Sequence, residues 1–159
     1  MTDDTRWLDA DEQRAWLRLA GVMLKLAPAL DSQLQRDAGM THFEYLCLAM
    51  LSEAEERTLR MSELAAKVNA SLSRLSHVVK KLEQRGWVER YPCPDSRRVT
   101  MARLTDDGMR ELVAAAPGHV GTVRALVFDG LSRDDVAALE RIAGHVVESI
   151  EHAGLRTVT

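Results

Sequence analysis

The stretch that decides the fold is residues 71–104, SLSRLSHVVKKLEQRGWVERYPCPDSRRVTMARL. Its first half repeats apolar residues at helical spacing, and Gly86 then supplies the left-handed residue that commonly ends a helix. Its second half reads as two strands, 87–91 and 99–104, which are rich in β-branched and aromatic residues and flank a loop with two prolines. We therefore expect a helix followed by a β-hairpin.

A shorter helix precedes this one across a tight turn. Ser62 can cap it, and the Asn-Ala-Ser sequence at 69–71 supplies the turn and the cap of the next helix. Two helices joined by about three residues form a helix-turn-helix, whose second helix enters the major groove of DNA. That helix should bury one apolar face, listed as Leu72, Leu75, Val78, Val79 and Leu82. Its outer face carries Ser73, Arg74, Ser76, His77, Lys80 and Lys81.

Two further helices are expected before this unit. Capping-box patterns at residues 9–12 and 41–44 open them, and the first carries an apolar stripe from Trp16 to Leu30. Pro28 lies inside the stripe, where it should kink or restart the helix.

Helices are also expected after the hairpin. Thr105 can cap a helix that should bend at residues 117–118, Pro-Gly, and end at Gly130. Ser132 with Asp135 opens a last helix with apolar residues at alternating spacings of three and four.

The apolar stripes at both ends need a partner to leave water, and the simplest partner is a second copy of the chain. A two-fold dimer would place two recognition helices about 34 Å apart, which predicts an inverted repeat in double-stranded DNA. The alternative is a monomer that packs its own terminal helices together. The predicted fold is mainly α with a small β-hairpin wing. Its segments are 1–40 (N-terminal dimerisation), 41–104 (winged helix-turn-helix lobe) and 105–159 (C-terminal dimerisation).

The charge is unevenly distributed along the 159 residues. Residues 57–103 hold 11 Lys and Arg against 4 Asp and Glu, a net charge of +7. Residues 1–56 have a net charge of −6 and residues 104–159 one of −4, so the whole chain has a net charge of −3. A basic segment that coincides with a helix-turn-helix favours contact with DNA phosphates over a merely solvated surface.

Composition excludes several other classes. The chain is 46% hydrophobic and 28% charged, as in an ordinary globular domain, and no apolar run approaches a membrane span. The start lacks the basic and apolar regions of a signal peptide, so we expect a cytoplasmic protein without a membrane partner. No phosphate loop, metal-ligand cluster or nucleophile motif stands out, so we expect neither an enzyme nor a cofactor or metal.

Two separated motifs, in consistent register, resemble the MarR family. Residues 95–105, DSRRVTMARLT, match that family's Asp-x-Arg and Leu-Thr pattern at the wing, and residues 86–90, GWVER, match the helix exit before it. Residues 123–132, VRALVFDGLS, look like the link between the family's last two helices. The resemblance covers about residues 12–152. It implies a dimeric transcriptional regulator, a repressor that a small phenolic or aromatic anionic ligand or an oxidant releases from DNA.

The predicted helix-turn-helix and the resemblance to the MarR family point to the same candidate DNA contacts. Ser71, Ser73, Arg74, Ser76, His77 and Lys80 lie at or beyond the start of the recognition helix. In the wing, Arg97 and Arg98 are expected to contact phosphates or the minor groove. Asp95 is expected to orient Arg97, because a carboxylate is repelled by phosphate. The alternatives are solvent-exposed side chains or a winged-helix module that binds protein instead of DNA.

The regulatory residues are less specific. Trp16 and His42 are candidates for an effector site that binds a small aromatic anion, with packing as the alternative for Trp16. Cys93 lies beside the wing, where oxidation would disturb the hairpin, but no resolving cysteine is near it in sequence. We therefore interpret Cys93 as incidental and Cys47 as a core residue.

Overall fold

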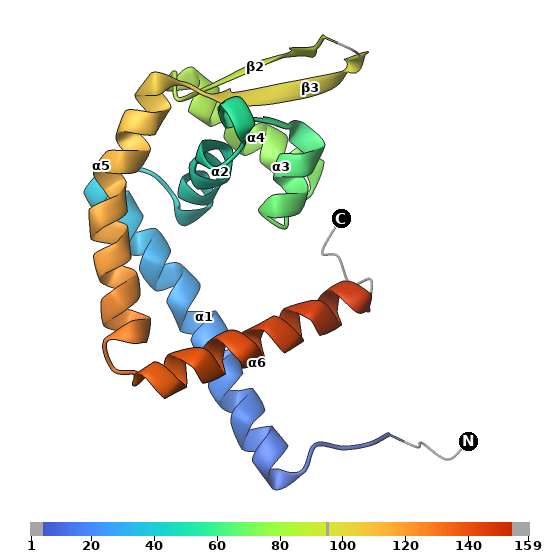
Figure 1. Cartoon of the computed structure of the whole chain (residues 1–159), viewed down its shortest axis with the longest axis vertical. Helices are drawn as coiled ribbons and strands as arrows, with labels where there is room; N and C mark the ends of the chain where they lie inside the picture. Colours follow the sequence, from blue (N-terminus) through green and yellow to red (C-terminus); the bar gives the residue numbers. More distant parts are fainter. Residues whose placement is uncertain (1–4, 95, 154–159) are drawn as a thin grey trace.

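The computed structural model describes residues 5–94 and 96–153, without the side chain of Arg97. Figure 1 shows a lobe of short helices and strands attached to three long terminal helices. The elements, in chain order, are α1 (Ala10–Ala38), α2 (His42–Ser52), η1 (Glu55–Arg57), β1 (Thr58–Arg60), α3 (Met61–Lys67), α4 (Leu72–Gln84), β2 (Val88–Cys93), β3 (Ser96–Leu104), α5 (Asp106–Val123), the π-helical turn η2 (Arg124–Phe128) and α6 (Arg133–His152).

Most helices begin at the residues that the sequence indicates. Asp9 and Thr41 form capping boxes, and the hydroxyls of Ser71 and Thr105 accept hydrogen bonds from the first turns of α4 and α5. The cap of α3 is Arg60 and not Ser62, because α3 starts directly after β1. The local signals therefore predict where the chain enters its helices to within two residues.

The two prolines do not interrupt their helices, although the sequence predicts a kink or restart at Pro28 and a bend at residues 117–118. α1 is continuous through Pro28, and α5 is continuous through Pro117. Each proline removes one backbone donor, whereas the packing of α1 against α5 and α2 holds both segments helical. The irregularity lies instead at η2, between α5 and α6.

The sheet has three strands in the order β1-β3-β2, all antiparallel. The sequence pattern predicts two of them but not β1, which has only three residues and pairs Leu59 with Ala102 of β3. The β2–β3 hairpin projects beyond the helices as a wing (Figure 1). β1 ties the base of this wing to α3, so the hairpin is a continuation of the lobe.

The core lies where α2, α3, α4 and the sheet meet, with the last turns of α1 and the first half of α5 packed against them. Its fully buried members are mostly leucines, listed as Leu34, Met40, Leu48, Leu51, Leu64, Leu75, Leu82, Val79, Val88 and Cys47. Gly86 has φ +75° at the end of α4, which glycine adopts without strain. Gly108 lets α5 approach the backbone just before β2 closely, because a Cβ there would lie 2.1 Å from the carbonyl oxygen of Trp87.

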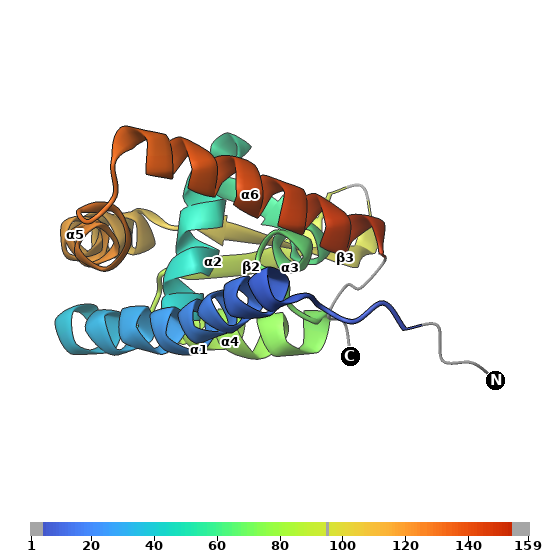
Figure 2. The ribbon, with the colours of Figure 1, turned by 90° about the horizontal axis from the view of Figure 1, so that it is seen from below.

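The terminal helices bury little of their apolar surface. α6 has no buried residue, and α1 has only Leu30, Gln33 and Leu34. Figure 2 shows α1 and α6 running along different sides of the molecule, so among the described residues α6 is not packed against α1, although α1 does pack against α5. Among the described residues, no helix combines the length and apolar content that crossing a bilayer would demand.

Candidate nucleic-acid interface

Helix α4 lies on the lobe with one face buried and the opposite face open. Leu75, Val79 and Leu82 are buried, as expected for the inner face. Leu72 departs from the expectation, because 52% of it is exposed. It stands in the first turn of α4, where it lines a groove towards the wing instead of entering the core.

The predicted contact residues of α4 lie on or beside its open face. Ser73, Arg74, His77 and Lys80 are exposed, whereas Ser76 is half-buried towards the wing. Ser71 acts as the cap, with its Oγ accepting a hydrogen bond from the backbone N–H of Arg74 at 3.2 Å. The helix therefore presents small polar and basic groups in one continuous surface, as a recognition helix requires.

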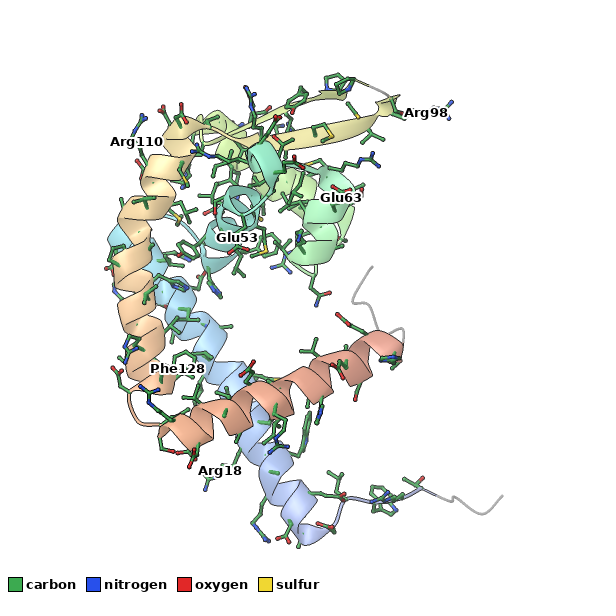
Figure 3. All side chains as sticks on the ribbon, viewed as in Figure 1. Arg18, Glu53, Glu63, Arg98, Arg110 and Phe128 are labelled. Atoms are coloured by element: carbon green, nitrogen blue, oxygen red, sulfur yellow. The ribbon has the colours of Figure 1, made fainter. Side chains whose placement is uncertain are left out.

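A groove of about 210 Å³ joins this helix to the wing. Leu72 and Ser76 of α4 form one side, and Arg90 of β2 and Arg98 of β3 form the other. Figure 3 shows Arg98 at the far end of the hairpin, away from the terminal helices. Recognition helix and wing are thus parts of one surface.

The cations of the lobe fall into two groups by their partners. The first group is held within the protein: Arg57 by Asp106, Arg60 by Glu63, Arg85 by the carbonyl oxygen of Gly39, Arg90 by Glu83, and Arg103 by Glu89. In the second group, no acceptor among the described residues bonds the side-chain nitrogens: Lys67, Arg74, Lys80, Lys81 and Arg98. Most of the second group lies on α4 and the wing, where free positive charge can meet phosphates.

The Arg90–Glu83 pair is a structural contact that no sequence pattern predicts. Arg90 Nη2 donates to Glu83 Oε2 at 2.6 Å and Nε donates to the same oxygen at 3.1 Å. The hydrogen bonds from Arg90 lower the pKa of Glu83 below its usual range. The pair ties α4 to β2, and so it fixes the helix relative to the wing.

Two predicted wing residues lie outside the description. Asp95 is not among the described residues, and nothing can be said of the Arg97 side chain, although its backbone belongs to β3. The expected support of Arg97 by Asp95 therefore stays a prediction.

Both cysteines are buried. Cys93, the last residue of the wing strand β2, is 8% exposed, and Cys47 lies in the core. Burial raises the pKa of the Cys47 thiol to about 12, so it carries no thiolate at neutral pH. These positions favour the interpretation of both thiols as packing residues.

Trp16 and His42 do not come together within one chain. Trp16 stands 22 residues before the end of α1, about 33 Å along a straight helix, whereas His42 follows that end. Trp16 is 51% exposed on its helix. A common effector site would therefore need both copies of a dimer.

His42 belongs instead to an aromatic cluster at the junction of α1, α2 and α5. The ring of His119 lies 5.5 Å from that of His42 and 4.4 Å from that of Tyr45, centroid to centroid. Burial lowers the pKa of His42 against the opposing attraction of Asp31, and burial followed by the nearby His42 lowers the pKa of His119. Both rings are therefore neutral at pH 7.

This junction also holds unpartnered polar atoms. Among the described residues, Oε1 of Gln33 and Nδ1 of His119 are buried without a hydrogen-bond partner. The amide nitrogen of Gln33 is engaged, since it donates to Asp37 at 2.9 Å. The sequence does not identify His119 as a candidate site residue, because nothing near His42 indicates that a residue 77 positions later packs against it.

Comparisons of sequence and of structure both match this chain to the MarR family. A sequence model described as the MarR family matches residues 40–100. The crystal structure of Sco3205, a MarR family transcriptional regulator from Streptomyces coelicolor in complex with DNA, is 45% identical with a TM-score of 0.89. That match covers 94% of this chain and 93% of the other.

A second structure and a curated relative extend the likeness. AbsC, a MarR family transcriptional regulator from Streptomyces coelicolor, is 38% identical with a TM-score of 0.81, over 91% of this chain and 99% of its own. The transcriptional repressor MprA of Escherichia coli is 25% identical over 113 residues, 71% of this chain. The match to MprA spans 64% of that protein's length.

Proposed function

The chain belongs to the MarR family of transcriptional regulators, and from that premise we propose that it binds double-stranded DNA as a homodimer and represses transcription. The observation that carries the proposal is the group of cations without protein partners on α4 and the wing. Phosphates would supply the missing acceptors, because contacts with Lys and Arg provide most of the non-specific affinity for DNA.

The homodimer accounts for the terminal helices. The exposed apolar residues of α6 recur along one stripe: Val136, Leu139, Ile142, Val146, Val147 and Ile150. Such a stripe normally marks an interface, and a two-fold dimer would bury it in both copies at once. The same symmetry would present two copies of α4 to an inverted repeat.

The DNA contacts divide by role. We assign Lys80 to phosphate, and Arg74 and His77 to base edges, with Ser71, Ser73 and Ser76 near the backbone. In the wing, Arg98 and Arg97 are assigned to phosphate or the minor groove, and Asp95 to the support of Arg97.

Release by a small aromatic ligand completes the proposal. Trp16 of one copy and His42 of the other are the candidate residues. Because His42 is neutral at pH 7, it would offer a hydrogen bond and not a positive charge. The proposed regulator acts in the cytoplasm and carries out no catalytic step.

The test begins with duplexes selected from a random library by the purified full-length protein. Affinity for a selected and a scrambled duplex is then measured by fluorescence anisotropy over a range of salt concentrations. We expect steep weakening with salt, and Lys80→Ala should reduce the salt slope by about one on both duplexes. Failure to enrich any sequence, with no salt-dependent binding, would favour a protein-binding module instead.

A further inference from the structure

Arg74 differs from the other arginines on α4 and at the base of the wing in how its guanidinium is held. Its Cζ lies 4.4 Å from the centroid of the Phe43 ring, within the range of a cation–π contact. No acceptor among the described residues bonds its side-chain nitrogens. One face of the guanidinium is thus supported, while the donors on its edge are free.

Phe43 is well placed to act as a rigid support. It is the second residue of α2, whose start is fixed by the capping box in which Thr41 Oγ1 accepts from Glu44 N and Glu44 Oε2 accepts from Thr41 N. Phe43 is half-buried and packs against the core. A ring that is anchored in this way restricts the many rotamers of a long arginine side chain.

Two other stacked arginines provide the contrast. Arg85 lies 4.7 Å from the Trp87 ring, but its Nη1 also donates to the carbonyl oxygen of Gly39 at 3.0 Å. Arg103 lies 5.9 Å from the Tyr91 ring and is also paired with Glu89. In both cases one guanidinium nitrogen is already bound inside the protein, so the stacked side chain is tied to the fold.

We propose that Phe43 is a positioning residue for DNA recognition, which holds the Arg74 guanidinium stacked beside α4 so that its free donors reach base edges. The proposal rests on the proposed function, since it requires α4 to enter the major groove. A stacked guanidinium keeps its in-plane donors available, and a bidentate arginine contact is the commonest way of reading guanine. Phe43 would therefore influence sequence preference from a helix outside the helix-turn-helix.

The experiment compares variants of the full-length protein on a selected and a scrambled duplex. Phe43→Leu removes the ring but keeps apolar volume, and Phe43→Tyr keeps the ring. We expect Phe43→Leu to lower the ratio of the two affinities by about 3- to 10-fold, from the loss of a cation–π contact, without changing the salt slope. Phe43→Tyr should keep the parent ratio. Tyr91→Leu is the matched control, because it removes a stacking ring from Arg103, which is already paired with Glu89 inside the protein.

A double variant tests whether Phe43 acts through Arg74. In an Arg74→Ala background, Phe43→Leu should cause no further loss of the affinity ratio. Thermal unfolding checks each variant, and Phe43→Met replaces Phe43→Leu if the latter does not fold. An unchanged ratio in folded Phe43→Leu overturns the proposal, as does an unchanged ratio in Arg74→Ala. In either case, salt-dependent binding by the parent would leave the proposed function standing.

Discussion

The DNA-binding lobe and the terminal helices use their apolar residues in opposite ways. The lobe buries its leucines completely, as Leu48, Leu64 and Leu75 show, whereas α6 buries none of its apolar residues. Both regions have the same periodic pattern in sequence. The lobe completes its core within one chain, with Leu34 of α1 and Leu112 of α5 included, whereas the apolar stripe of α6 stays exposed and would be covered in the proposed dimer.

Charge separates the same two regions. The net charge of +7 lies in residues 57–103, which include α3, α4 and the wing, and both flanking segments are acidic. Acidic flanks are repelled by DNA phosphates, so they favour one orientation of the molecule on the duplex. The segment that carries the positive charge is thus the one that contains the helix and the wing suited to DNA.

The largest expected effect is the loss of packing inside the lobe. Leu48→Ala removes a side chain with 0% exposure and should reduce the free energy of unfolding by about 2 to 5 kcal/mol. The loss relative to the parent should be the same at low and high protein concentration, because the cavity lies within one chain. Urea unfolding at two concentrations measures it. A loss that grows on dilution would place this core at the dimer interface, which would contradict a lobe that completes its core within one chain.

The next effect concerns the apolar stripe of α6. Ile142→Glu places a carboxylate where 53% exposure of the single chain would become burial in the dimer. We expect dissociation into monomers at concentrations where the parent is dimeric, with a lobe that stays folded and DNA affinity lowered at least about tenfold. Light scattering measures the dissociation, circular dichroism the folding of the lobe, and anisotropy titration the DNA affinity. Arg141→Glu, on the neighbouring exposed position, is the control. Dimers that resist Ile142→Glu would remove α6 from the interface.

A smaller effect should separate free from paired arginines in the lobe. Arg98→Ala removes a cation without a described partner at the wing tip and should weaken DNA binding by about 1 to 2 kcal/mol, with little change in stability. Arg103→Ala, which removes a cation already paired with Glu89, should weaken DNA binding less. Anisotropy titrations on one selected duplex give both values. Equal losses would show that pairing within the protein does not predict DNA contact.

The smallest effect is a pH dependence at the junction between the two regions. Both His42 and His119 have a folded-state pKa below the ordinary value of 6.5, so the unfolded chain binds protons more readily. Their neutral, folded arrangement is therefore fully stable above about pH 6.5, and stability falls as the pH drops below that value towards the folded pKa. The melting temperature of His119→Gln should fall less than that of the parent between neutral and mildly acidic pH. His145→Gln, at an exposed site on α6, is the control. Parallel curves for parent and His119→Gln would exclude the cluster as the source.

Much of the fold could be predicted from sequence because its signals are local. The caps at Asp9, Thr41, Ser71 and Thr105 act over three residues, and the apolar period of α4 acts over one helix. β1 could not be predicted, because three residues form a strand only when β3 is beside them. That α1 and α5 continue as helices through Pro28 and Pro117 also depends on tertiary structure, since packing between α1 and α5 offsets a single lost hydrogen bond.

The candidate DNA site also has features that local sequence predicts and features that only tertiary contacts decide. The sequence by itself determined which residues stand on the open face of α4, because helical periodicity sorts Ser73, His77 and Lys80 away from the core. It also determined that the basic charge is concentrated in the middle of the chain. Only the tertiary structure decided which of those charges are free, because ion pairs and stacking join residues that are distant in sequence. Arg74 rests on Phe43 and Arg57 is held by Asp106, and no local pattern encodes either contact.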